Sequence, residues 1–207
     1  LKRAMQQGVK VVSYDSDVAV GARTLFLNQA KGDSLAEMML ESMGQLIGYS
    51  GDFAILSSTP TASNQNAWIE FMKAKMKADP KYAKMNLVQV AYGQESEQVN
   101  QQQALALAQA FPNLKGIIIP AGIGLPAAAR ALDQAKLLDK IKLTGLAPAT
   151  LIKKYIQDGN VQDIWWNVKD LGYLTYYAAQ QVAMRKVRKE GDTFKALWLD
   201  DYTVGED

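Results

Sequence analysis

Short apolar segments alternate with amphipathic, helix-like segments along the 207-residue chain, and this alternation constrains its fold most strongly. The apolar segments are continuous runs, such as AILSS at residues 54–58 and GIIIP at residues 116–120, without a polar residue at every second position. Continuous apolar strands fit a sheet that is covered on both faces. Strands that alternate with helices pair in parallel through right-handed crossovers. The pattern therefore predicts an α/β fold with a doubly wound parallel sheet.

The alternation divides the chain into predicted strands, helices and turns. The predicted strands are residues 10–14, 53–57, 87–91, 116–119, 142–145 and 163–167. The predicted helices are residues 34–46, 64–78, 97–110, 125–132, 149–157 and 171–189. The opening LKRAMQQG is typical of the end of a helix that stops at Gly8, so we expect the chain to be part of a longer protein.

Several absences limit the function. The chain has no histidine and no cysteine, which removes the commonest general base, the commonest metal ligand and all thiol chemistry. Its net charge is only +2, and no basic run is interleaved with aromatic residues, so we expect no nucleic-acid partner. Neither the dinucleotide-binding fingerprint nor the Walker phosphate loop occurs. No apolar run approaches the roughly 20 residues that span a bilayer. We expect no catalytic residues, no metal and no cofactor.

Ligands of open α/β sheets bind beyond the carboxyl ends of the strands. The segments in that position are residues 14–17, 58–65, 120–122, 146–148 and 166–167. They hold polar, aromatic and small residues, which suit a neutral polar ligand that is bound by hydrogen bonds and by stacking on an aromatic ring.

Four segments resemble a known family. They are VVSYDSD (11–17), SSTPTASNQNAWIEFMKAKM (57–76), AFPNLKGIIIPAGIGLPAAARAL (110–132) and IWWNVKDLGYLTYYAA (164–179). They are similar to the type I periplasmic sugar-binding proteins of ABC importers and, within these, to the receptors for rhamnose and for autoinducer-2. The resemblance covers nearly the whole chain. It implies two α/β lobes that close on a sugar by hinge closure. Residues 1–30 and 168–207 would form parts of lobe 1 and the hinge, with lobe 1 incomplete, and residues 31–167 would form lobe 2.

The resemblance also implies ligand contacts in lobe 2 and at the end of the first strand. Asp15 matches the acid that contacts ligand hydroxyls in the autoinducer-2 receptors, and Asn64-Gln65 match their Asp-Gln pair. Pro120 and Gly122 match a proline and a small residue, alanine in those receptors, that contribute backbone contacts. Asn64 for Asp and Gly122 for Ala are two departures from those receptors, and the loss of the carboxylate changes which hydroxyls the site can bind.

A tryptophan pair completes the ligand-binding residues that we expect. Trp165 and Trp166 alternate across a predicted strand, so one is expected in the core and one can face the ligand. Trp166 and Asn167 lie nearest the family position. The ribose- and glucose-type relatives carry an acid after the strand that matches residues 142–145, and Leu146-Ala147 in its place argues against that subgroup.

Structural roles compete with some of these expectations. Aspartates are common in loops, and strand alternation points Asp17 away from Asp15, so Asp17 is expected to serve the loop. Ser63 is expected to cap the following helix. The Gln-rich patch at residues 94–103 is expected to be a solvated first helical turn.

The resemblance implies a monomeric solute-binding protein that captures a small sugar, rhamnose-like or autoinducer-2-like, for an ABC importer permease. We expect it to be periplasmic or extracellular, with or without a lipid anchor, and to meet the membrane only through the permease or that anchor. The alternative is the effector-binding core of a sugar-responsive transcription regulator, which has the same fold. A flavodoxin-like or nucleotide-dependent enzyme is disfavoured by the missing phosphate loop and histidine.

Overall fold

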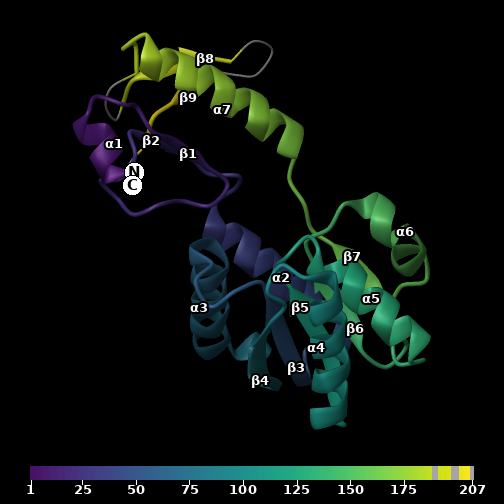
Figure 1. Ribbon diagram of the computed structural model, residues 1–207. Helices are drawn as coiled ribbons and strands as arrows, with labels where there is room; N and C mark the ends of the chain where they lie inside the picture. The colour runs from purple at the N-terminus through teal and green to yellow at the C-terminus, as the bar shows by residue number, and fades with distance from the viewer. Residues whose placement is uncertain (188–190, 197–200, 206–207) are drawn as a thin grey trace. The chain divides into compact units, whose positions relative to one another are not determined.

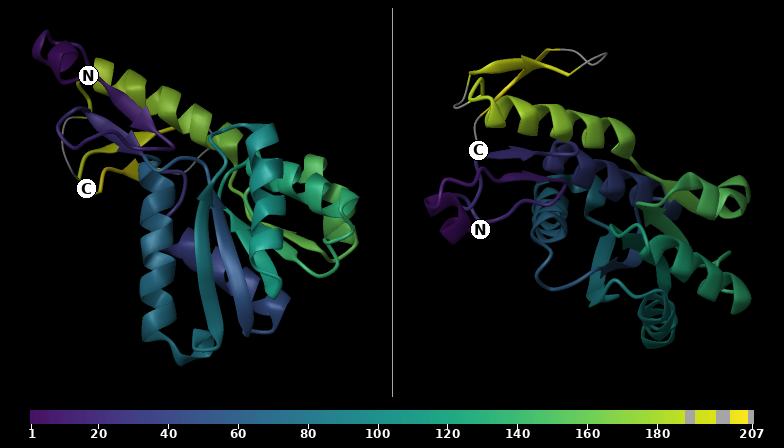
Figure 2. Two further views of the ribbon diagram at one scale, coloured as in Figure 1. Left: turned by 60° about the horizontal axis from the view of Figure 1, so that its bottom comes forward. Right: turned by 45° about the horizontal axis from the view of Figure 1, so that its top comes forward.

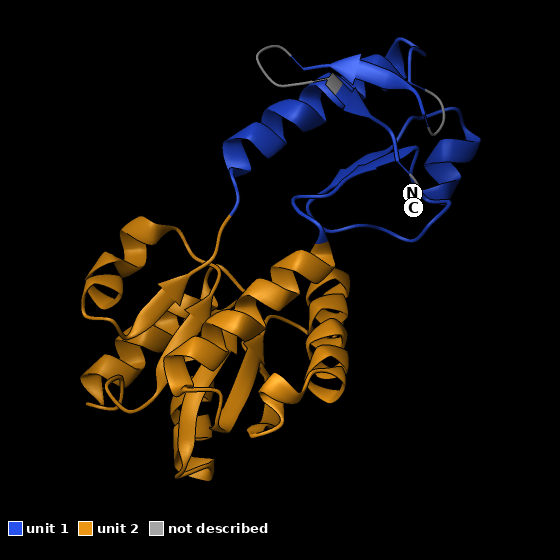
Figure 3. Cartoon of the chain, turned by 180° about the vertical axis from the view of Figure 1, so that it is seen from behind, with its two compact units in different colours: residues 1–31, 166–207 blue, residues 32–165 orange. Residues whose placement is uncertain are grey.

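The computed structural model describes residues 1–187, 191–196 and 201–205 (Figure 1). The chain forms two compact units (Figure 3): unit 1 is residues 1–31 with 166–207, and unit 2 is residues 32–165. Each unit has its own sheets and its own apolar cluster.

Unit 2 is a five-stranded sheet with helices on both faces (Figure 2). Its strands are β3 (Gly51–Ser57), β4 (Met85–Tyr92), β5 (Leu114–Ile119), β6 (Lys142–Gly145) and β7 (Val161–Asp163). Its helices are α2 (Gly32–Ile47), α3 (Ser63–Ala78), the 3-10 helix η1 (Pro80–Tyr82), α4 (Glu97–Ala110), α5 (Gly124–Gln134) and α6 (Ala149–Gln157). The strand order is β4-β3-β5-β6-β7, and every neighbouring pair is parallel. Helices α2 and α3 pack together on one face, and α4, α5 and α6 cover the other. The predicted doubly wound parallel sheet is confirmed.

The central strands are apolar on both faces. Residues 53–57 of β3 are all buried, and residues 117–119 of β5 have no exposed surface. Leu125 and Leu132 of α5 pack on one face of these strands. Each such side chain contributes about 1.5–3 kcal/mol when it is fully buried. This is why the continuous apolar runs of the sequence become the middle of the sheet.

Strand β7 differs from its prediction. Elements β6, α4 and α6 have the predicted bounds, but the strand predicted at residues 163–167 is wrong, because Asp163 ends β7. Pairing stops there because β6 ends at Gly145, which lies opposite Asp163 and turns away with φ 150°. The N–H of Ile164 donates one last bond to the Gly145 carbonyl at 2.9 Å, and the chain then leaves the sheet.

Unit 1 contains α1 (Lys2–Gln6), β1 (Val12–Tyr14), β2 (Leu25–Leu27), α7 (Val168–Ala183), β8 (Thr193–Lys195) and β9 (Asp201–Thr203). Strands β1 and β2 pair in parallel, and β8 and β9 pair antiparallel. The sequence did not indicate β2, β8 or β9. Leu27 of β2 is buried against Leu171 and Ala178 of α7. Helix α7 ends at Ala183, earlier than predicted, and residues 188 and 189 of the predicted helix lie outside the described residues. The opening segment is a helix that stops before Gly8, as predicted.

A charged cluster around Glu41 ties α2 to η1. Lys81 Nζ donates to both carboxylate oxygens of Glu41 at 2.8 Å. The hydroxyls of Tyr49 and Tyr82 donate to the same carboxylate at 2.5 and 2.8 Å. The hydrogen bond from Lys81 and then that from Tyr49 lower the pKa of Glu41 to about 2. The folded state therefore favours the charged carboxylate.

Glu41→Gln should lower the melting temperature at pH 7, because the three donors above and Gln45, at 3.2 Å, lose a charged acceptor. A hydrogen bond to a charged group contributes about 1.5–3 kcal/mol to the free energy of unfolding. Because Glu41 is partly exposed, solvent screens these bonds, and the expected loss is about 1 kcal/mol. A lowered pKa stabilises the fold fully above the unfolded value of 4.5, and this contribution is lost as the pH falls towards about 2. Thermal unfolding at pH 7 and pH 3 should show a difference between the two proteins that narrows at pH 3.

Glu70→Gln is the matched control, because Glu70 makes an exposed pair with Lys73 at 2.8 Å and should affect the melting temperature little at either pH. A difference between Glu41→Gln and the unmodified protein that stays constant with pH would contradict the role given to the Glu41 charge.

Candidate functional site

The carboxyl ends of the unit 2 strands meet at one edge of the sheet because the strands are parallel. The segments after β3, β5 and β6 at this edge are residues 58–62, 120–123 and 146–148, and none of them contains a charged residue. Helices α3, α5 and α6 begin there, and their N-cap residues, Ala62, Ile123 and Pro148, make no side-chain cap in the described structure. The positive ends of these three helices therefore lie at this edge.

Asn64 lies in the first turn of α3. The prediction that Ser63 caps this helix is wrong: the N-cap is Ala62, whose backbone is extended (φ −71°, ψ 98°), and the helix begins at Ser63. Asn64 Oδ1 accepts a hydrogen bond from the N–H of Gln65 at 2.8 Å. The amide nitrogen of half-buried Asn64 is left as a donor.

Gln65 is anchored to the end of β3. It is buried, and its Oε1 accepts from Ser57 Oγ at 2.7 Å and from the N–H of Ser58 at 2.9 Å. Because a backbone N–H can only donate, the atom that faces Ser58 is the amide oxygen. The oxygen is thus committed to the protein, and the –NH2 group remains as a donor.

Pro120 and Gly122 follow β5. Pro120 is buried, whereas Gly122 is exposed, and a Cβ added there would meet no atom within 4 Å. The Ala121 carbonyl accepts from the N–H groups of Gly124 and Leu125 at 2.9 and 3.3 Å, which fixes the turn into α5. The structure thus brings Asn64, Gln65, Pro120 and Gly122 to the same edge of the unit 2 sheet.

Asp163, the last residue of β7, is a strand-end acid that the sequence did not single out. Its Oδ1 accepts from the N–H of Ala147 at 3.2 Å, and its Oδ2 is buried with no partner in the described part of the chain. Burial raises its pKa above the usual value, although the backbone N–H groups of Ala147 and Ile164 act against this. Its carboxyl group therefore lies beside the loop that follows β6.

Asp15 follows β1 in unit 1 with left-handed backbone geometry, φ 64°, which few residues besides glycine, asparagine and aspartate adopt. Its N–H donates to the Leu27 carbonyl at 3.1 Å. Partial burial raises the pKa of the carboxyl group, and no donor within the described residues opposes this shift. A half-buried carboxylate that lacks an internal donor and sits on strained backbone is typical of a ligand-binding position.

Asp17 is bound within its own loop. Its carboxylate accepts from Ser13 Oγ, from the N–H of Val18 and from Arg23 Nε at 2.8, 2.8 and 2.7 Å. Partial burial raises its pKa, but the hydrogen bonds from Arg23, Ser13 and Val18 outweigh burial and leave the pKa below its usual value. These contacts give Asp17 a structural role in the loop.

The tryptophan pair divides between the two units. Trp165 of unit 2 is 65% exposed, whereas Trp166 packs against the apolar cluster of unit 1. The indole N–H of Trp166 is buried and has no acceptor among the described residues. Asn167 is the N-cap of α7: its Oδ1 accepts from the N–H of Asp170 at 3.1 Å, and its Nδ2 donates to the Asp170 carboxylate.

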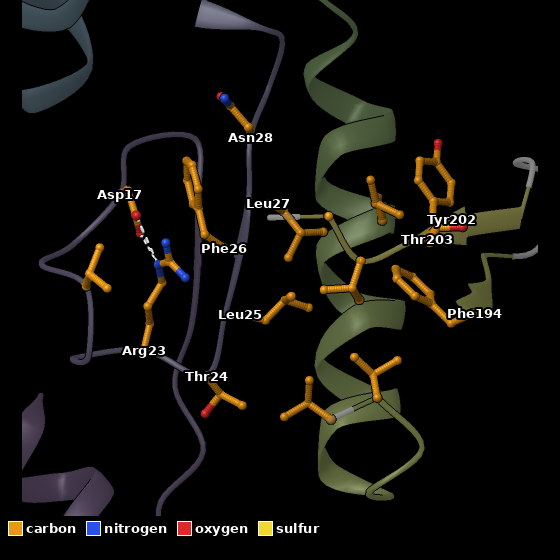
Figure 4. Close-up of a pocket in the computed structure, with 16 residues that line it drawn as sticks. Asp17, Arg23, Thr24, Leu25, Phe26, Leu27, Asn28, Phe194, Tyr202 and Thr203 are labelled. Carbon is orange, nitrogen blue, oxygen red and sulfur yellow. Dashed lines mark hydrogen bonds and ion pairs between the residues drawn. The ribbon is translucent and has the colours of Figure 1, made fainter. Parts of the chain in front are cut away.

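A cavity of about 680 Å³ in unit 1 contains none of the predicted ligand contacts (Figure 4). Leu25 and Leu27 of β2, together with Phe194, contribute apolar walls, and Asp17 is paired there with Arg23. Thr24, Asn28, Tyr202 and Thr203 also line this cavity, and its two charged side chains, Asp17 and Arg23, bind each other.

The described residues contain no group of three or more metal-ligating side chains. No helix in the described part is long and apolar enough to cross a membrane. The polar candidate residues can form hydrogen bonds with a ligand. Asn64 and Gln65 at the edge of unit 2 offer donors, and Asp15 in unit 1 offers a carboxylate acceptor.

Residues 1–186 match the family of the periplasmic binding protein domain. The chain belongs to this family. The family and the type I α/β fold expected from the sequence are thereby confirmed.

Solved structures agree with this assignment. A sugar ABC transporter protein of Actinomyces odontolyticus is 36% identical, with a TM-score of 0.79, over 99% of this chain and 66% of its own length. A solute-binding protein of Clostridium phytofermentas with bound L-rhamnose is 36% identical, with a TM-score of 0.87, over 93% of this chain and 61% of its own. The LsrB protein of Clostridium saccharobutylicum in complex with AI-2 is 22% identical, with a TM-score of 0.87, over 97% of this chain and 64% of its own, and shows the fold alone. This chain thus spans slightly less than two thirds of each of these proteins.

The two aspartates of the first loop should differ in their effect on stability. Asp17→Asn should destabilise the fold by roughly 2 kcal/mol, because Arg23, only 8% exposed, loses its charged partner. Asp15→Asn should leave the melting temperature unchanged or slightly raised, because asparagine keeps the left-handed backbone and removes a half-buried charge. Thermal unfolding of the two variants at pH 7 measures the difference. Equal losses would contradict the separate roles of Asp15 and Asp17.

Proposed function

We propose that this protein is a solute-binding protein that captures a small neutral sugar, rhamnose-like or autoinducer-2-like, and delivers it to the permease of an ABC importer. The observation that carries the proposal is the 36% identity to a solute-binding protein with bound L-rhamnose, over 93% of this chain. The protein would act as a monomer in the periplasm or outside the cell, free or held by a lipid anchor. It makes and breaks no bond.

The proposed ligand contacts complement sugar hydroxyls. The amide –NH2 groups of Asn64 and Gln65 would donate, and the backbone at Pro120 and Gly122 lies at the same edge of the sheet. Asp15 accepts from a hydroxyl, which supplies the donor that its carboxylate lacks among the described residues. Trp166 and Asn167 complete the proposed set, with Trp166 as the apolar face for the sugar ring.

Hinge closure is the proposed physical cycle. If the ligand hydroxyls contact residues of both units, only a closed state collects all the contacts. Binding then shifts the population towards that state. The permease would recognise the closed protein.

A thermal-shift measurement on the whole protein tests the proposed ligand class. L-rhamnose, other deoxy sugars, D-arabinose and AI-2 are compared, and at least one should raise the melting temperature by several degrees. A ligand at 100 times its Kd adds about 2.7 kcal/mol to the stability of the folded state. Asp15→Asn should abolish the shift, whereas Asp17→Asn should keep it from a lower starting temperature. No shift with any of these ligands, or chemical turnover of a bound sugar, would contradict the proposal.

Gly122→Ala tests the backbone contact after β5. The added methyl group meets no protein atom within 4 Å, so the melting temperature without ligand should not change. If the ligand lies against Gly122, the methyl group takes space from it, and calorimetry should show binding of the sugar identified above weakened by about tenfold, or 1.4 kcal/mol.

Gly172→Ala on α7 is the matched control, because its Cβ also meets no atom within 4 Å, and it should leave the Kd unchanged. An unchanged Kd for Gly122→Ala would remove Gly122 from the ligand contacts.

A further inference from the structure

Asn100 is a buried amide in a stretch that the sequence predicts to be solvated. It lies in the first turns of α4, within the Gln-rich patch, yet it is only 1% exposed while Gln98 and Gln102 are exposed. The expectation that this whole patch is a solvated turn is therefore wrong at Asn100. Asn100, Ala104 and Leu107 form the buried side of α4, at the spacing of one helix face.

The amide nitrogen of Asn100 clamps the loop that follows β4. Nδ2 donates to the carbonyl of Gly93 at 3.3 Å and to the carbonyl of Ser96 at 2.8 Å. Between these two residues, Gln94 and Glu95 both have left-handed backbone geometry, with φ 53°. Such strained residues persist only where the surrounding contacts hold them, and Asn100 supplies two of these contacts.

The same amide lies against two glycines, Gly93 at the start of the loop that follows β4 and Gly124 at the start of α5. A Cβ on Gly124 would come within 2.8 Å of Asn100 Oδ1, and a Cβ on Gly93 would overlap the amide directly. Oδ1 is buried and has no hydrogen-bond partner in the described residues. It thus places an acceptor at the positive end of α5, whose own N-cap, Ile123, has no polar side chain.

The β4 loop is in turn bonded to the residues that hold Gln65. The N–H of Gly93 donates to the Ser57 carbonyl at 2.8 Å, and the N–H of Gln94 donates to the Ser58 carbonyl at 2.7 Å. Ser57 and Ser58 are the residues that bind Gln65 Oε1. A continuous set of contacts therefore runs from Gln65 on α3, through the ends of β3 and β4, to Asn100 and the start of α5.

We infer that Asn100 is a positioning residue that fixes the Asn64-Gln65 segment and the 120–124 turn relative to each other. It touches no proposed ligand contact itself and acts through the 93–96 loop on one side and Gly124 on the other. The consequence for sugar binding rests on the proposed function. The mechanical coupling of the two segments does not.

Amide hydrogen exchange of the whole ligand-free protein tests the coupling directly. Asn100→Ala should raise exchange both in residues 93–96 and in residues 120–125. Gly124→Ala, which displaces the Asn100 amide or Ile119 from the α5 side, should raise exchange in residues 93–96 although Gly124 itself is not part of that loop. In the Asn100→Ala background, Gly124→Ala should no longer affect residues 93–96. Gly124→Ala keeps the test available if Asn100→Ala does not fold.

Ser42→Ala is the matched control, because Ser42 is another buried polar residue of unit 2 with two hydrogen bonds, to Thr144 and Gln162 at 2.7 and 2.5 Å. It should lower the melting temperature without a change in either segment. With L-rhamnose, or whichever sugar stabilises the unmodified protein, Asn100→Ala should weaken binding about tenfold and Ser42→Ala should not.

The outcomes separate the two proposals. If no sugar binds the unmodified protein, the proposed function fails, and hydrogen exchange still decides the role of Asn100. The inference about Asn100 is overturned if Gly124→Ala leaves residues 93–96 unchanged in the presence of Asn100. It is also overturned if Asn100→Ala affects sugar binding no more than Ser42→Ala does.

Discussion

The parallel pairing of β3 with both β4 and β5 is the interaction on which the rest of unit 2 depends. A strand in that place has neighbours on both edges and helices on both faces, so it must be apolar on both faces, as residues 53–56 are. Parallel pairing also requires a crossover after each strand, and every crossover starts at the same edge. The polar residues of 57–65 and 93–100 and the backbone of the 120–124 turn therefore meet there. The position of the candidate site follows from the hydrophobic core.

Hydrogen-bond accounting at this edge decides which atoms remain for a ligand. Gln65 and Asn64 each commit an oxygen to a backbone N–H of the protein, so both keep their –NH2 groups. Asp15 in unit 1 shows the opposite pattern, because its carboxylate has no donor among the described residues. Asp17, two residues away, is saturated by Ser13, Val18 and Arg23. Two acids at the end of one strand thus have different roles, because one loop supplies donors to only one of them.

The sequence predicted the elements that its apolar periodicity marks and missed those that depend on pairing partners. Helices α4 and α6 and strand β6 have the predicted bounds because their periodicity and turn residues coincide. Strand β7 is misplaced because its length is set by Gly145 of β6, which no local pattern reveals. Strand β2 was missed because only three residues pair, and their burial comes from α7, more than 140 residues later. The predicted cap at Ser63 is wrong for a similar reason: the backbone becomes helical at Ser63 and is extended at Ala62, so Ala62 is the N-cap.

The burial of Asn100 was missed because the glutamine-rich composition around it conceals the helical spacing of the buried residues. Glutamines surround it, but its spacing of four residues to Ala104 and seven to Leu107 places it on the buried face of α4. A buried amide needs acceptors for its nitrogen and a donor for its oxygen. The carbonyls of the neighbouring loop serve the Asn100 nitrogen, and the oxygen has no partner among the described residues. Gly93 and Gly124 become informative only when the fold places each of them against the Asn100 amide.

Charge narrows the class of ligand that this arrangement favours. The unit 2 segments after β3, β5 and β6 are uncharged. Asp163, which contacts the segment after β6, has a buried carboxylate oxygen and a raised pKa. Asp15 is half-buried, and burial already raises its pKa. An anionic ligand would bring a second negative charge to the Asp15 carboxylate. The unit 2 segments contain no cation that would attract such a ligand. A hydroxyl can donate to Asp15, and a hydroxyl can equally accept from the amides of unit 2, so a neutral polyhydroxylated ligand suits each set of groups without the burial of an unpaired charge.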